Sequence, residues 1–268
     1  MENVYHTIKN SKRIVVKVGT STLTYETGKL NLNRMDRLAM ILSDLHNQGK
    51  EIILVSSGAI GVAVGKLGLS KKPSETKYKQ AVAAVGQCEL MFLYDKLFSE
   101  YNNTVAQILL TKDDIAIPKR KQNTQNTFNA LLEMGIIPIV NENDTISVEE
   151  IEFGDNDTLS AIVADFVDAD LLVLFSDIDG FYDSDPHVNN DAKLIPCVSD
   201  ISSVRSLAGG VGSNRGTGGM ITKLDAAEIA TGSGINMIIT NGDNIDGLYD
   251  ILQGKSVGTL FVAKGQGE

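Results

Sequence analysis

Short apolar runs rich in β-branched residues alternate with helical patterns along almost the whole chain. Amphipathic helices are predicted between the runs, for example at 34–49, 75–101 and 157–169. Apolar strands bounded by helices form mostly parallel sheets that are covered on both faces. We therefore expect an α/β fold, a three-layer αβα sandwich around a mostly parallel sheet. The predicted strands are RIVVKVG (13–19), EIILVSS (51–57), TVAQILL (104–110), IIPIVNEN (136–143), LLVLFSDIDG (171–180), INMIIT (235–240) and TLFVA (259–263).

Polar side chains gather at the carboxyl ends of four predicted strands. Lys17 lies in KVGTS, Ser57 in VSSGAIG, Asp144 in VNEND and Asp177 in FSDIDG. Chance does not readily place such residues at four equivalent strand ends. In sheets of this kind the ligand binds beyond the carboxyl ends of the strands. This edge of the sheet is therefore the predicted site.

The composition is that of a globular protein without a basic face. A chain of 268 residues with no evident linker or repeat indicates a single domain, 1–268. Its 24 Lys and Arg against 34 Asp and Glu give a formal net charge of −10, which argues against nucleic acid or an anionic membrane as the main partner. Cys88, Cys197 and three scattered histidines indicate neither a disulfide framework nor a zinc site. The polar N-terminus and the lack of an apolar run near ~20 residues indicate a cytoplasmic protein.

Two common nucleotide-binding signatures are missing from the chain. GKS at 254–256 resembles the end of a P-loop, but the position that a P-loop reserves for its first glycine is Tyr249. No GxGxxG motif opens a helix after the first strand. A P-loop enzyme and a dinucleotide-dependent dehydrogenase are therefore disfavoured.

Glycine-rich turns next to cations or hydroxyls leave two explanations open in each case. GSNRGTGGMITK (212–223) is either a loop without a role or a backbone site for an anion, which Lys223 reaches from the first turn of a helix. Lys17 before Gly19 either contacts a phosphate or reaches water from the strand end. VSSGAIG (55–61) either binds a carboxylate or phosphate at a helix N-terminus or is a tight strand–helix junction.

Acidic and amide side chains concentrate in NENDT and GDNDTLS, which contain Asp144, Asp155, Asn156 and Asp157. These residue types favour turns and helix N-caps, so an N-cap for a helix near 157 is one explanation. Binding of an ammonium group, a lysine or Mg²⁺ is the other. SDIDGFYDSDP, which starts at Ser176, is similarly either a polar loop or part of a site.

Taken in order, these segments resemble the amino-acid kinase family over essentially the whole chain. VVKVGTS, LFSDIDGFYDSDP and GTGGMITK fit several of its members, whereas VSSGAI, NEND and GDND are more specific to members that phosphorylate the γ-carboxylate of glutamate. The resemblance implies the amino-acid kinase fold, with an acceptor-binding part to about 170 and a nucleotide-binding remainder. It implies L-glutamate and ATP as substrates, and Mg²⁺ held mainly by ATP phosphates and water rather than by protein ligands.

The resemblance also assigns a role to each motif. Lys17 and Lys223 are expected to neutralise the transferred phosphoryl group, and Asp157 is expected to hold both lysines in place. The expected substrate-binding residues are Ser57, Gly58, Ala59, Asp144 and Asn156. The expected nucleotide-binding residues are Lys17, Gly19, Ser176, Asp177, Thr217, Gly218, Gly219, Met220, Ile221, Thr222 and Lys223.

Expectations about partners follow from the resemblance as well. The product enters proline synthesis, proline is a possible feedback inhibitor, and channelling to glutamyl-phosphate reductase is expected because acyl phosphates hydrolyse readily. A homo-oligomer, dimer or tetramer, is expected. Many bacterial members add a C-terminal PUA domain, and none is expected here because the chain ends soon after TLFVA. Two alternatives stay open: a sibling kinase of acetylglutamate, carbamate or UMP, and a non-catalytic sensor of ATP or proline.

Overall fold

The structure, a computed structural model, describes residues 2–25, 27–146, 156–186, 188–208 and 219–265. Its strands are β1 (Arg13–Val18), β2 (Glu51–Ser56), β3 (Val105–Leu110), β4 (Ile137–Glu142), β5 (Leu171–Ser176), β6 (Cys197–Val198), β7 (Asn236–Asn241) and β8 (Thr259–Phe261). Its helices are α1 (Glu2–Lys9), α2 (Thr20–Leu23), α3 (Leu32–Asn47), α4 (Ala59–Lys66), α5 (Thr76–Ser99), α6 (Lys112–Ala116), α7 (Pro118–Glu133), α8 (Asn156–Phe166), α9 (Ile201–Val204), α10 (Met220–Gly232) and α11 (Gly247–Leu252), with a 3₁₀ turn at Arg205–Ala208.

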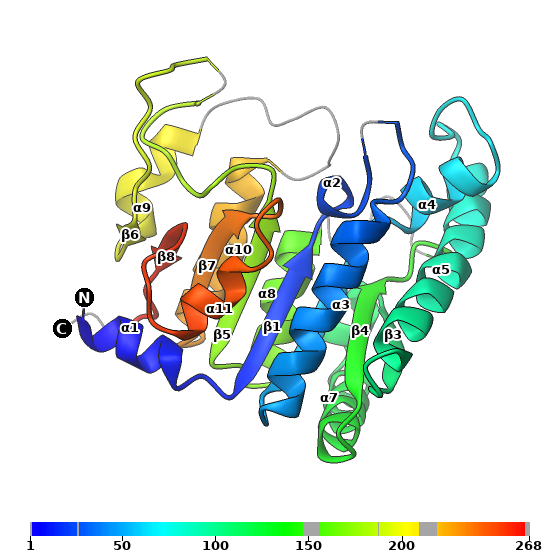
Figure 1. The fold of residues 1–268 in the computed structure, drawn as a ribbon, viewed down its shortest axis with the longest axis horizontal. Helices are drawn as coiled ribbons and strands as arrows, with labels where there is room; N and C mark the ends of the chain where they lie inside the picture. Colours follow the sequence, from blue (N-terminus) through cyan, green and yellow to red (C-terminus); the bar gives the residue numbers. More distant parts are fainter. Residues whose placement is uncertain (1, 26, 147–155, 187, 209–218, 266–268) are drawn as a thin grey trace.

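The described strands form one sheet in the order β3-β4-β2-β1-β5-β7-β8-β6. The pairs that join β3, β4, β2, β1, β5 and β7 are all parallel, so these six strands end at one edge. Helices cover both faces of the sheet (Figure 1). The expected αβα sandwich around a mostly parallel sheet is therefore confirmed.

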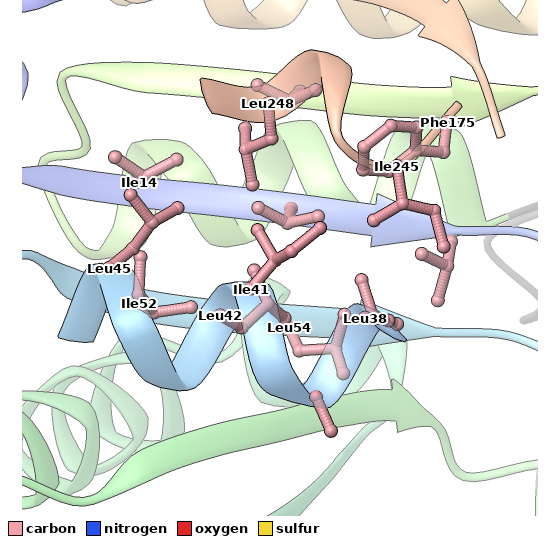
Figure 2. Close-up of a cluster of buried hydrophobic side chains, with 14 of the residues drawn as sticks. Ile14, Leu38, Ile41, Leu42, Leu45, Ile52, Leu54, Phe175, Ile245 and Leu248 are labelled. Atoms are coloured by element: carbon pink, nitrogen blue, oxygen red, sulfur yellow. The ribbon is translucent and has the colours of Figure 1, made fainter. Parts of the chain in front are cut away.

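Successive side chains of each central strand enter two different cores, because a strand points its residues alternately to opposite faces. Ile14 and Val16 of β1 lie in one core with α3, α5 and α11, which we call the α3–α5 layer. Figure 2 shows part of this core, where Ile14, Ile52 and Leu54 of the sheet contact the apolar face of α3. Val15 lies in the other core with α7, α8 and α10, the α8–α10 layer. This alternation decides where the polar residues at the strand ends point.

Three elements at the margins of the fold go beyond what the sequence predicted. The run TLFVA forms only the short strand β8, which is antiparallel to β7, and β6 pairs with β8 at the end of the sheet. Two residues are too few to show a period, and an apolar run does not encode strand direction. Helix α1 was not predicted either, since the single pair of Val4 and Ile8 fixes its buried face.

Candidate active site

Lys17 lies near the end of β1 on the α8 side of the sheet. It follows Val15 by two residues, so strand alternation brings it to the face that α8 covers. Its exposed fraction is 8%. A buried ammonium group is costly unless an anion pairs with it. The anion has to come from an element that packs on this face of the sheet.

Asp157, in the first turn of α8, supplies this anion and binds a second lysine as well. Its Oδ1 pairs with Lys17 Nζ, and its Oδ2 accepts a hydrogen bond of 2.9 Å from Lys223 Nζ. Lys223 lies one turn into α10 and is 7% exposed. These three residues form what we call the lysine–aspartate cluster. Two positive charges and one negative charge leave a net charge of +1 at the carboxyl edge of the sheet.

Burial and the neighbouring charges shift the pKa of Asp157 in opposite directions. Burial alone would raise its pKa, but the ammonium groups of Lys17 and Lys223 outweigh this effect and lower the pKa to about 2. The carboxylate is therefore ionised throughout the neutral range. One buried anion fixes the positions of two cations that come from opposite ends of the chain.

The N-cap explanation for Asp157 does not hold. Helix α8 begins at Asn156, so Asp157 lies within its first turn. An N-cap side chain bonds to backbone N–H groups of its own helix. Here both carboxylate oxygens face lysines instead, and the side chain is 1% exposed.

The turn from β2 to α4 brings Ser57, Gly58 and Ala59 to the same edge. The backbone N–H of Ser57 donates to the Val18 carbonyl at 3.0 Å, which ties this turn to the end of β1. Gly58 has a φ of 102°, in the left-handed region that favours glycine, and α4 starts directly after it. The first N–H groups of a helix have no partner within the helix. The turn therefore offers backbone donors to an anion next to Ser57.

Asn156, the first residue of α8, contacts Ser57 across the sheet edge. Its Nδ2 donates to Ser57 Oγ at 2.7 Å and to Asn141 Oδ1 at 2.9 Å. Asn141 Nδ2 in turn donates to Gln87 Oε1 at 2.9 Å. Neither Asn141 nor Gln87 was predicted from the sequence to belong to the site. The available signal was a carboxamide among apolar neighbours: Asn141 lies in an apolar strand and Gln87 in the apolar stripe of a helix, and both are buried.

Gly86 allows α5 to approach this turn very closely. A Cβ atom at Gly86 would lie 1.7 Å from the carbonyl oxygen of Ala59 and 3.0 Å from the Cβ of Ala63. Real Cβ contacts with backbone are essentially never that short. Helix α5 thus packs directly on the first turn of α4, which belongs to the candidate anion site.

We expect Gly86→Ala to lower the free energy of unfolding by about 2 to 3 kcal/mol, because the added methyl group must displace the backbone of α4. Chemical denaturation of the variant and the wild type measures this. Gly232→Ala in α10 is the matched control, since a Cβ there meets nothing within 4 Å. Equal stability of Gly86→Ala, Gly232→Ala and the wild type would contradict the close approach.

Of the described residues expected to bind nucleotide, Gly19, Ser176, Asp177 and Gly219 lie on segments that flank the lysine–aspartate cluster. A Cβ at Gly19 would lie 3.6 Å from Lys17 Nζ, so this backbone is next to the ammonium group. Ser176 ends β5, the neighbour of β1, and its hydroxyl donates to Asp177 Oδ1 at 3.1 Å. Gly219 precedes α10, and its carbonyl accepts a 2.7 Å hydrogen bond from Thr222 Oγ1.

The remaining expected residues lie at the start of α10, in the turn after β4, or outside the described residues. Met220 and Ile221 open α10, and the 51% exposed Ile221 turns its side chain outward. Asp144 lies half-buried in the turn after β4. Thr217 and Gly218 lie outside the described residues.

Metal and membrane features can be assessed for the described part of the chain. There, no group of three or more His, Cys, Asp or Glu side chains is arranged to hold a metal ion. Of the helices that the structure describes, none combines the length and apolar character needed to span a bilayer.

In this αβα sandwich, two lysines share one carboxylate beside glycine turns at the strand ends. This arrangement defines a class of phosphoryl-transfer proteins that work without a P-loop. The chain belongs to the amino acid kinase family, whose family model matches residues 12–241.

Relatives with assigned names cover nearly the whole chain. It is 60% identical over 262 residues to the glutamate 5-kinase of Clostridium perfringens, which is 96% of this chain and 97% of that protein. It is 57% identical over 257 residues to the glutamate 5-kinase of Clostridium tetani, with 96% of each covered. The solved structure of UMP kinase from Bacillus anthracis is similar with a TM-score of 0.64, over 95% of this chain and 97% of that one. At 18% identity this last likeness bears on the fold alone.

Proposed function

We propose that this protein transfers the γ-phosphoryl group of ATP to the γ-carboxylate of L-glutamate. The products are L-glutamyl 5-phosphate and ADP, and the reaction is the first step of proline biosynthesis. The lysine–aspartate cluster is the observation that carries this proposal, because its net positive charge lies at the edge where the glycine turns meet. Identity of 60% to a glutamate 5-kinase supports glutamate as the acceptor.

The chemistry needs positioning and charge more than proton transfer. A γ-carboxylate oxygen attacks the γ-phosphorus, a new oxygen–phosphorus bond forms, and the bond to the β–γ bridging oxygen breaks with its electrons on ADP. A carboxylate is ionised at neutral pH, so no general base is required. Lys17 and Lys223 neutralise the charge that spreads over the transferred group, and Asp157 holds their ammonium groups in place.

The acceptor fits the turn after β2 and the start of α8. The hydroxyl of Ser57 and the backbone at Gly58 and Ala59 are donors for a carboxylate, and α4 begins there. The amino-acid head lies against Asn156, which contacts Ser57, and against Asp144. A carboxylate such as Asp144 forms a charge-assisted hydrogen bond with a free ammonium group. With a blocked amine it would face a neutral group instead.

The nucleotide lies on the other side of the cluster in this proposal. The part of the chain after about 170 supplies Ser176, Asp177 and the start of α10 with Gly219, and Gly19 lies against Lys17. Mg²⁺ supplies further neutralisation of the phosphate oxygens when bound. This cation prefers oxygen ligands and retains water, so ATP phosphates and water hold it without a dedicated protein site.

Partners and location belong to the same proposal. The acyl phosphate hydrolyses readily in water, which favours direct transfer to a glutamyl-phosphate reductase. Feedback inhibition by proline and assembly into a homodimer or homotetramer are proposed by resemblance to the family. We propose a cytoplasmic location, since ATP and glutamate are supplied there.

The acceptor assay tests the proposal. We expect ADP release with L-glutamate, and release near background with acetylglutamate, aspartate or UMP, because only glutamate offers both a γ-carboxylate of the right reach and a free ammonium group. A coupled ADP assay over the four acceptors at equal concentration measures this. Faster turnover with acetylglutamate or UMP than with glutamate would contradict the proposed acceptor.

A further inference from the structure

Four hydrogen-bonded side chains cross the carboxyl edge of the sheet from one helical layer to the other. The chain of contacts runs from Gln87 through Asn141 and Asn156 to Ser57, with distances of 2.9, 2.9 and 2.7 Å. We propose that Gln87 is a positioning residue for the acceptor: through Asn141 it fixes which way the carboxamide of Asn156 faces. This inference rests on the proposed function, because it concerns how the amino-acid head is recognised.

The path across the edge follows from the strand pattern. Asn141 lies two and four residues after Ile139 and Ile137 of β4, so the three residues point to the same face of the strand. Ile137 and Ile139 both enter the α3–α5 layer. Its side chain therefore turns toward α5, where its nitrogen meets Gln87, while its oxygen reaches Asn156 at the start of α8. Gln87 lies in the buried stripe of α5 and is only 8% exposed. A carboxamide buried to this degree has to be hydrogen-bonded, so its partner is fixed by the packing of α5 on the sheet.

The order of donors and acceptors gives the chain of contacts a direction. A carboxamide has one oxygen that accepts and one nitrogen that donates. Gln87 Oε1 accepts from Asn141 Nδ2, and Asn141 presents its oxygen to the opposite side. That oxygen accepts from Asn156 Nδ2 at 2.9 Å and from the backbone N–H of Glu142 at 2.9 Å. Gln87 and the β4 backbone together hold Asn141 in one orientation.

The orientation of Asn141 sets what Asn156 and Ser57 offer to a ligand. Both protons of Asn156 Nδ2 are used, one toward Asn141 and one toward Ser57, which leaves Oδ1 as the group to present. An oxygen acceptor matches an α-ammonium group. Ser57 Oγ accepts from Asn156, so its own proton is available to donate to a carboxylate. A reversed Asn156 would turn a donor toward the ammonium group and lose this match.

The test compares glutamate with glutarate, the same diacid without the α-ammonium group. We expect Gln87→Met, which removes the acceptor for Asn141, to raise KM for glutamate roughly tenfold, the scale for losing one buried hydrogen bond. KM for ATP should stay within about twofold, and the ratio of kcat/KM for glutamate over glutarate should fall roughly tenfold. Gln87→Glu keeps an oxygen acceptor toward Asn141 and is expected to retain most of the wild-type ratio.

Each of the following results decides whether Gln87 positions the acceptor-binding residues. An unchanged glutamate-to-glutarate ratio in Gln87→Met, or an equal loss in Gln87→Glu, would overturn the positioning role. If thermal unfolding shows that Gln87→Met does not fold, Gln87→Asn replaces it with the same expected result, because its side chain is one methylene too short to reach Asn141. A wild-type enzyme without glutamate-dependent turnover would overturn the proposed function. An active wild type with an unchanged ratio in the variant would overturn only the role of Gln87.

Discussion

Replacing Asp157 by Asn is expected to lower kcat by roughly 10³-fold or more. One preorganised charge donor contributes about 10² to 10³ in kcat, and this carboxylate positions two of them, Lys17 and Lys223. Asn keeps the size of the side chain but cannot balance two ammonium groups. Steady-state kinetics with saturating ATP and glutamate measures the loss. Asp165→Asn, about two turns further along α8, is the control and should keep full activity.

The same substitution is expected to cost stability. Breaking a buried ion pair from one side costs about 3 to 5 kcal/mol, because the partner charge stays buried and unpaired. The pH dependence has the sign of a carboxylate whose pKa falls on folding, from 3.8 to about 2. Its contribution is complete above pH 3.8 and is lost as the pH falls toward 2. A fully active and equally stable Asp157→Asn variant would contradict the role of the cluster.

Lys223→Met is expected to lower kcat by roughly 10²-fold or more, with KM for ATP changed by only a few-fold. Removing this lysine leaves Lys17 and Asp157 as a neutral pair, since one positive and one negative charge cancel. The transferred phosphoryl group then loses the net positive charge that stabilises it. Met has a similar length and apolar stem, so packing of α10 is largely kept.

ADP assays measure the loss of kcat in Lys223→Met, and calorimetric titration measures the change in its affinity for ATP. Lys264→Met removes an exposed lysine near the end of the described chain and is the matched control. Turnover of Lys223→Met close to that of Lys264→Met would show that Lys223 does not act on the transferred group.

The sequence predicted the fold well where the pattern is strong. The central strands β1, β2, β4 and β5 are apolar runs bounded by helical segments, and all four lie in the sheet as expected. Strand β8 lies within the predicted run TLFVA, but its antiparallel direction was not predicted, and the two-residue strand β6 was missed because two residues carry no period.

The sequence predicted the site residues that stand in motifs and missed those that carry no motif. Lys17, Asp157 and Lys223 stand in recognisable motifs, although 66 residues separate Asp157 from Lys223 and only folding brings them together. Gly86, Gln87 and Asn141 carry no motif of their own. Their importance comes from how α5 crosses α4 and the ends of β2 and β4, which is a property of packing rather than of spacing along the chain.

Trapping the product with hydroxylamine tests the central proposal most directly. An acyl phosphate reacts with hydroxylamine to give a hydroxamate, whereas a phosphate ester does not. With ATP, Mg²⁺ and L-glutamate, we expect γ-glutamyl hydroxamate to form in the same amount as ADP, and neither to form when glutamate is left out. ADP release with glutamate but without hydroxamate, or no glutamate-dependent ADP release at all, would contradict phosphorylation of the γ-carboxylate.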